Sequence, residues 1–90
     1  MPMDPVMDDR HTSPIRRLTE RGQRWRVMVE TWHDRDEFHG RLLFRQEAVE
    51  GAEASLESAT LLHGRSREDV LALAHDLPED QLRRLLLSLG

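Results

Sequence analysis

The residues best suited to chemistry in this chain lie between His33 and His39. The segment reads His-Asp-Arg-Asp-Glu-Phe-His, which places two imidazoles and three carboxylates close together. Imidazole nitrogens and carboxylate oxygens are common ligands of divalent metals such as zinc. The spacing matches no known ligand motif, and an acidic polar segment is also what a solvated turn requires. The sequence therefore predicts a turn here, with no metal site and no cofactor.

No other group of residues points to catalysis. His11, His63 and His75 stand alone in the sequence. The chain has no cysteine, which excludes thiol nucleophiles, disulfides and cysteine-based zinc sites. A glycine-rich phosphate loop is lacking, and no serine stands beside a His-Asp pair in a recognisable motif. We therefore expect a protein that is not an enzyme.

Two alternating runs flank the polar segment and must position it. Residues 24–31 and 38–45 each alternate apolar and polar side chains. A period of two predicts a half-buried antiparallel hairpin. With residues 32–37 as its loop, the hairpin pairs Trp25 with Phe44 and gathers the large apolar side chains on one face.

In the second half of the chain, the spacing of the apolar side chains changes from that of a strand to that of helices. A weaker alternation at residues 56–62 predicts a third strand. Residues 67–77 and 78–89 then place apolar side chains three and four positions apart, as amphipathic helices do. Ser66 is a good N-cap, and Pro78 suits the first helical position. The first apolar stripe is Val70, Leu73, Ala74 and Leu77. The predicted fold class is α+β, with a small antiparallel sheet of two or three strands followed by two C-terminal amphipathic helices.

Composition sets the broad class of protein. Residues 1–22 hold three of the 4 prolines and predict a flexible N-terminal tail, which leaves residues 23–90 as a single small domain. No apolar run approaches the roughly 18 residues that span a bilayer, and the first residues do not resemble a secretory signal. Every basic residue is arginine, a composition typical of a GC-rich genome. We expect a bacterial, cytoplasmic protein without membrane contact.

The second face of the predicted hairpin is the best candidate for a binding surface. It mixes arginines with large apolar side chains: Arg26, Met28, Trp32, Arg41, Leu43 and Arg45. Three interpretations are open. In the first, the face docks a protein, because Trp, Met and Arg are enriched at interfaces. In the second, it binds nucleic acid through its arginines and a stacking Trp. In the third, a helix or the N-terminal segment covers it. The net charge of −4 disfavours nucleic acid.

These observations predict a non-enzymatic protein-protein interaction module, an accessory or regulatory subunit of a larger bacterial assembly. The alternative is a small nucleic-acid-binding regulator that uses the arginines of this face. The order of strands and helices is similar in layout to that of small bacterial antitoxins of the HicB type, and a likeness of layout alone implies no function. Leu87 lies off the main stripe of the last helix, so a small core would leave apolar surface uncovered. We therefore expect a homodimer or a complex with another protein, with Leu87 added to the partner-binding residues.

Overall fold

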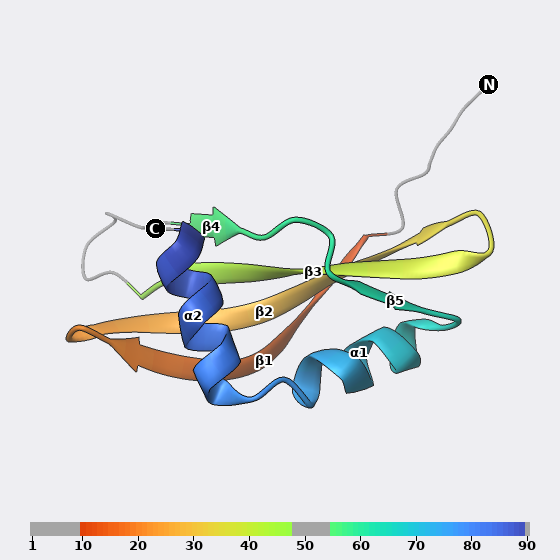
Figure 1. Cartoon of the computed structure of the whole chain (residues 1–90). Coiled ribbons are helices and arrows are strands. Elements are labelled where there is room, and N and C mark those ends of the chain that lie inside the picture. Colours follow the sequence, from red (N-terminus) through yellow and green to blue (C-terminus); the bar gives the residue numbers. More distant parts are fainter. Residues whose placement is uncertain (1–9, 48–54, 90) are drawn as a thin grey trace, which may run out of the picture.

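The computed structural model describes residues 10–47 and 55–89 (Figure 1). In chain order, the elements are β1 (His11–Glu20), β2 (Gln23–Asp34), β3 (Glu37–Gln46), β4 (Ser55–Glu57), β5 (Leu62–Gly64), α1 (Arg67–His75) and α2 (Glu79–Leu89). The strands form one antiparallel sheet in the order β1-β2-β3-β4, and β5 also pairs with β3. The prediction of two or three strands is wrong, because this α+β fold has a 5-stranded sheet.

The additional long strand, β1, lies within the segment predicted to be a tail. It pairs with β2 along its whole length through a turn at Arg21 and Gly22, whose φ angles of 55° and 78° are both positive. Positive φ at both central positions is the geometry that two-residue hairpins favour. Pro14 is tolerated because β1 is an edge strand, and a bulge follows it. Residues 1–9 of the predicted tail lie outside the described residues.

The predicted register of the β2–β3 hairpin is also wrong, by two residues. Phe44 pairs with Val27 instead of Trp25. The turn is shorter than the predicted loop, because Trp32, His33 and Asp34 continue β2 and Glu37 begins β3, so that only residues 35 and 36 lie between the strands. A shift of two residues leaves every side chain on its original face. The division of the hairpin into an apolar and a mixed face therefore survives the error.

The far edge of β3 is shared by two short strands instead of one strand at residues 56–62. β4 pairs with one half of β3 and β5 with the other half. Ser58 bridges the break between them: its hydroxyl accepts a hydrogen bond from the Leu42 N–H at 2.9 Å and donates one to the Ala59 carbonyl at 2.8 Å. Ser58 is only 4% exposed, and its bond to the Leu42 N–H satisfies a buried donor of β3.

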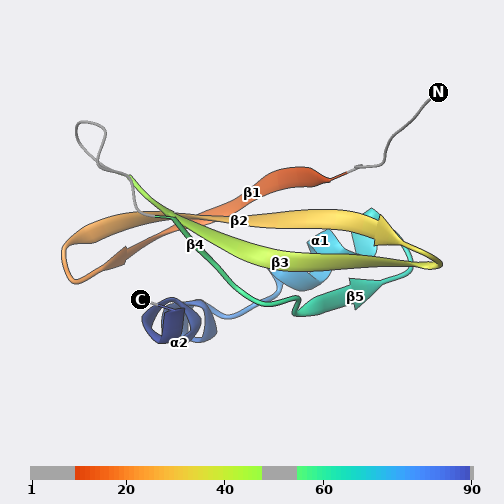
Figure 2. The same cartoon turned by 90° about the horizontal axis from the view of Figure 1, so that it is seen from above.

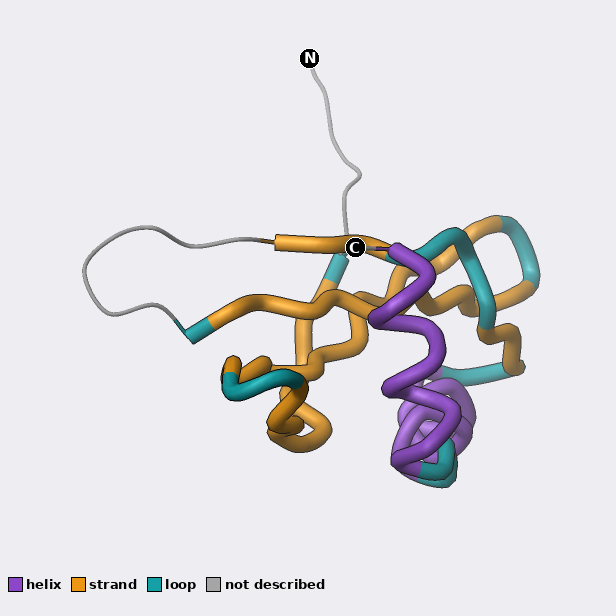
Figure 3. The backbone as a smooth tube through the Cα atoms, turned by 60° about the vertical axis from the view of Figure 1, so that its left-hand side comes forward, coloured by secondary structure: helices purple, strands orange, loops and turns teal. Residues whose placement is uncertain are grey.

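Both helices pack on the same face of the sheet (Figure 2), which we call the inner face. α2 rises from the end of α1 and turns sharply away from its axis (Figure 3). The core between the layers consists of Leu18, Val27, Val29, Leu42, Phe44, Leu62, Val70, Ala74, Leu82 and Leu86. Gly40 lies in β3 beneath α1, where an added Cβ would come within 2.5 Å of Val70 Cγ1. A side chain at this position would therefore push α1 away from the sheet.

The predicted start of the first helix is confirmed at Ser66. Its hydroxyl accepts a hydrogen bond from the Asp69 N–H at 3.1 Å. The predicted stripe needs one correction: Leu73 is exposed, and Leu71 packs against the core instead. At the second helix, the Pro78 carbonyl accepts hydrogen bonds from the first turn of α2.

Arg83 ties α2 to the end of β1. Its guanidinium donates a hydrogen bond to the Thr19 carbonyl at 3.2 Å and lies 3.5 Å from the Glu20 carboxylate. It also donates to Glu79 one helical turn earlier, and this hydrogen bond is the main cause that raises the pKa of Arg83 above its ordinary value. The contacts fix the position of α2 along the inner face and leave the opposite face untouched.

Candidate functional site

The face of the sheet opposite the helices is the candidate site, and we call it the outer face. Side chains along a strand alternate between the two faces of the sheet. The residues next to the buried ones in β2 and β3 therefore point to the outer face. Its central residues are Arg26, Met28, Glu30 and Trp32 of β2 and His39, Arg41, Leu43 and Arg45 of β3. Within the described residues, no helix lies over this face (Figure 2).

The structure brings six of the seven predicted partner-binding residues together on the outer face. Arg26 and Arg45 are exposed, and the side chains of Trp32, Arg41 and Leu43 are half-buried. The sixth residue, Met28, is only 7% exposed and pairs with Pro14 on one side and Leu43 on the other. Met28 therefore packs beneath its neighbours on the outer face and offers little area of its own to a partner.

Leu87 does not belong to this group. It is 47% exposed on α2, in the helical layer on the other side of the sheet. There it helps to line an apolar hollow of about 340 Å³ together with Trp25, Leu56 and Leu86. The predicted set thus divides into one surface on the sheet and one leucine at a separate hollow.

A row of ion pairs crosses the outer face. Glu30 lies between two arginines, with its carboxylate 2.7 Å from Arg41 Nε and 3.2 Å from the Arg10 guanidinium. Arg41 also reaches Glu57 on β4 at 3.2 Å. Because Glu30 is 16% exposed, its charge is better shielded from water than that of an ordinary surface carboxylate. The central arginine of the face is therefore already paired with carboxylates.

A second ion-pair group lies nearer the β1–β2 turn. The Glu47 carboxylate is 3.1 Å from Arg17 Nε and 3.9 Å from Arg26 Nε. Together with the row at Glu30, this pairing balances much of the positive charge that the sequence places on the face. The outer face is thus a mixed surface with alternating signs and not a basic patch.

Aromatic rings gather at the other end of the face. Trp32 stacks on His39 with ring centres 6.0 Å apart, and the Arg10 guanidinium lies 4.5 Å from the Trp32 ring centre. His39 in turn meets the edge of His63 on β5 at 4.7 Å. Stacked rings and a cation above a Trp face favour particular orientations of their partners, by about 0.5–1.5 kcal/mol for each contact. This end of the face is therefore preorganised.

The same end contains a cluster of imidazoles and carboxylates. Glu37, His39 and His63 each offer one ligand atom, and these atoms lie within 4.8 Å of one another. Asp34 is close as well, with a carboxylate oxygen 3.7 Å from His39 Nε2. Such groups can exchange protons or coordinate a cation.

The sequence missed this cluster because it depends on strand pairing. His63 reaches His39 only through the β3–β5 ladder, and no local spacing reveals that pairing. Conversely, His33, which the sequence places in the loop, is in β2 on the inner side, where it stacks on Phe38 with ring centres 4.5 Å apart. Only part of the chemistry-bearing segment thus contributes to the cluster.

Neither helix in the described ranges is both long and apolar enough to cross a bilayer. The chain matches no protein-family profile, and no curated protein or solved structure is found to be similar to it.

Proposed function

We propose that this protein is a non-enzymatic interaction module whose outer face docks a protein partner, as an accessory or regulatory subunit of a larger assembly. The observation that supports the proposal is the one-sided architecture. Both helices pack on the inner face, and Trp32 and Leu43 stay partly exposed on the outer face of the described structure. A bacterial source and a cytoplasmic location remain predictions from composition.

The chemistry of the face suits a protein more than any other partner. Protein interfaces centre on aromatic and arginine anchors surrounded by polar groups. Trp32 and Leu43 supply apolar contact area here, and exposed Arg45 supplies donors at the rim. Because stacking against His39 already restricts the orientation of Trp32, docking would cost less side-chain entropy at this residue.

The alternative function is a nucleic-acid-binding regulator that uses the arginines of the same face. Phosphate binding requires guanidinium groups that can release counterions. Arg26 and Arg41 lie beside carboxylates instead, and the net charge of the chain is −4. We therefore expect no saturable binding of single-stranded or duplex probes at physiological salt.

Site-specific photo-crosslinking tests the proposal. A photoreactive amino acid is placed at Leu43 on the outer face and, as a matched control, at Leu73, which is 45% exposed on α1. Both variants are irradiated in cells of the native host. We expect a discrete protein adduct from position 43 and none from position 73, because only the first lies on the proposed docking face.

The nature of the adduct separates the alternatives. An adduct with nucleic acid at position 43 would replace protein docking by the regulator hypothesis. An adduct between two copies of the chain would identify the partner as a second copy, as in the predicted homodimer. A third variant with the photoreactive residue at Leu87 then shows whether the hollow at α2 contributes to the dimer interface. Equal yields at positions 43 and 73 would contradict the proposal.

A further inference from the structure

The cluster at the end of the outer face has the composition of a metal site. Its ligand atoms are two imidazole nitrogens and one carboxylate oxygen, from Glu37, His39 and His63. Nitrogen and oxygen donors in this mixture suit zinc and related transition metals, whereas calcium and magnesium take oxygen alone. We propose that these three residues bind a divalent transition-metal ion, and that zinc fits them best.

The distances between the donors support this proposal. The Glu37 carboxylate lies 3.8 Å from His39 Nε2 and 3.9 Å from His63 Nδ1. In a tetrahedral zinc site with bonds of about 2.1 Å, donors are roughly 3.4 Å apart. All three ligand atoms lie within 4.8 Å of one another, and Glu37 and His63 are exposed, so their side chains have room to rotate toward the shorter separation.

A fourth possible ligand, Asp34, lies close to the three residues. Asp34 pairs with Glu37 across the β2–β3 ladder, and its carboxylate lies 3.7 Å from the His39 ring nitrogen. It completes the four ligands that structural zinc sites use, or leaves the position to water.

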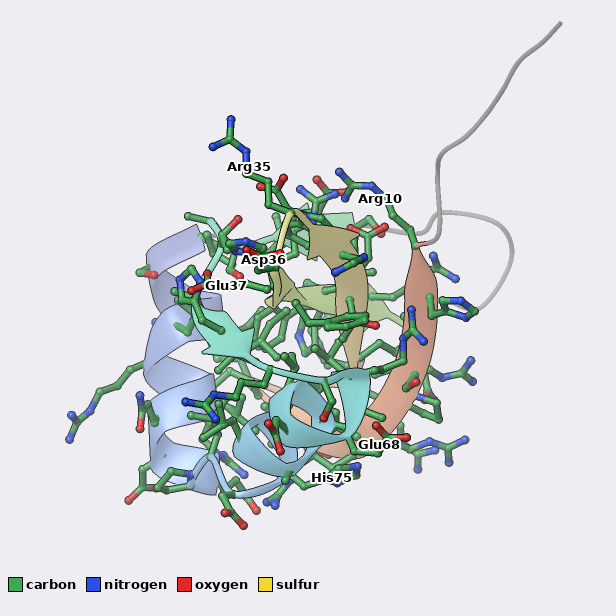
Figure 4. The ribbon with its side chains drawn as sticks, turned by 90° about the vertical axis from the view of Figure 1, so that its right-hand side faces the viewer. Arg10, Arg35, Asp36, Glu37, Glu68 and His75 are labelled. Carbon is green, nitrogen blue, oxygen red and sulfur yellow. The ribbon has the colours of Figure 1, made fainter. Side chains whose placement is uncertain are left out.

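The electrostatics of the hairpin tip favour a dication. A polar hollow of about 460 Å³ lies beside the cluster and is lined by Asp34, Arg35, Asp36, Glu37 and His39. The three carboxylates outnumber the single guanidinium. The side chain of Arg35 points away from Asp36 and Glu37 (Figure 4). A bound cation would relieve the repulsion among these carboxylates.

The scaffold holds the donors on paired strands. His39 pairs with His63 in the β3–β5 ladder, and the stacking of Trp32 on His39 fixes the imidazole, which is 16% exposed. Sites on paired strands are more precise than sites on loops. The three proposed ligands come from β3 and β5, and the fourth donor, Asp34, comes from the end of β2. These strands lie near the β2–β3 turn (Figures 1 and 2).

The geometry also assigns the metal a role. β5 spans only Leu62–Gly64, pairs with β3 alone, and leads directly to the N-cap of α1 at Ser66. A metal bound by His63 together with Glu37 and His39 would hold β5 against β3. The bound ion therefore stabilises the junction between the sheet and α1, as structural zinc does in small domains.

Calorimetric titration of the full-length, tag-free protein with zinc chloride tests this inference. We expect saturable one-to-one binding that Glu37→Gln and His63→Ala each weaken at least about tenfold, because losing even an outer-shell partner costs 10–100-fold. Both positions are exposed, so the variants should keep the fold, which circular dichroism verifies. His75→Ala is the matched control, since His75 is an exposed histidine on α1, well away from the hairpin tip (Figure 4).

Hydrogen exchange provides the second readout. Zinc should slow the exchange of the β5 amides in the wild-type protein and leave that of His63→Ala unchanged. No saturable binding, or binding that His63→Ala leaves intact, would overturn the inference. Calcium binding of equal strength that persists in His63→Ala would instead assign the ion to the acidic turn alone.

Discussion

Replacing Phe44 with alanine should lower the free energy of unfolding by about 3–5 kcal/mol. Phe44 is fully buried at the centre of the sheet, where it pairs with Val27 on β2 and Leu56 on β4. A core of this size rarely supplies more than about 3–5 kcal/mol in total, so the variant should be largely unfolded at 25 °C. Urea titration followed by circular dichroism measures the effect.

Two further variants calibrate this result. Phe44→Leu keeps most of the apolar volume and should retain the fold with a smaller loss. Trp25→Ala should also lose less than Phe44→Ala, because Trp25 is only half-buried and pairs with Gln46 in the observed register. A greater loss at Trp25 than at Phe44 would favour the register in which these two rings pair, and would contradict the structure.

The second large loss of stability is expected for a substitution in α2, where the two leucines Leu82 and Leu87 differ strongly in burial. Leu82 is fully buried against the sheet, whereas Leu87 is 47% exposed. Leu82→Ala should cost about 2–5 kcal/mol through lost burial and the cavity left behind. Leu87→Ala should change the stability of the fold by no more than about 0.5 kcal/mol, as exposed substitutions usually do.

Thermal melts at two protein concentrations separate folding from association in this pair. If Leu87 contributes to a homodimer, its substitution lowers the melting temperature more at the higher concentration, where mass action favours the dimer. The cost of Leu82→Ala should not depend on concentration in this way. Equal losses at both positions and at both concentrations would show that α2 does not pack on the sheet through Leu82.

Local physics made much of the fold predictable. Strict alternation identified two of the three long strands and both of their faces, because side chains on a strand have a period of two. The N-cap at Ser66 and the stripe of α2 were readable for the same reason, since caps and helical periodicity act over four residues or fewer.

The features that depend on distant pairing were not predictable. β1 was missed because Pro14 and scattered charges mask its alternation, and an edge strand tolerates both. The register was shifted because Trp32 and the polar residues His33 and Asp34 were assigned to the loop, although all three continue β2, whereas β3 begins only one residue earlier than predicted. Polarity alone does not separate the exposed end of a strand from a turn.

The candidate site shows the same division. The alternation of the hairpin placed Arg26, Trp32 and Leu43 on one face, and the shift of two residues preserved that face. The contribution of His63 was invisible, because it rests on the pairing of β5 with β3. The ion pairs that make the face electrically mixed also join residues far apart in the sequence.

The central claim is that the outer face meets a protein partner, and the two tryptophans of the chain allow a direct test. Trp32 lies on the outer face and Trp25 on the inner face, and both are half-buried. Hydroxyl-radical footprinting by mass spectrometry compares the oxidation of each ring in the purified protein and in native-host cells. We predict that Trp32 becomes protected in cells relative to Trp25. Equal oxidation of Trp32 in both settings, or selective protection of Trp25, would contradict the claim.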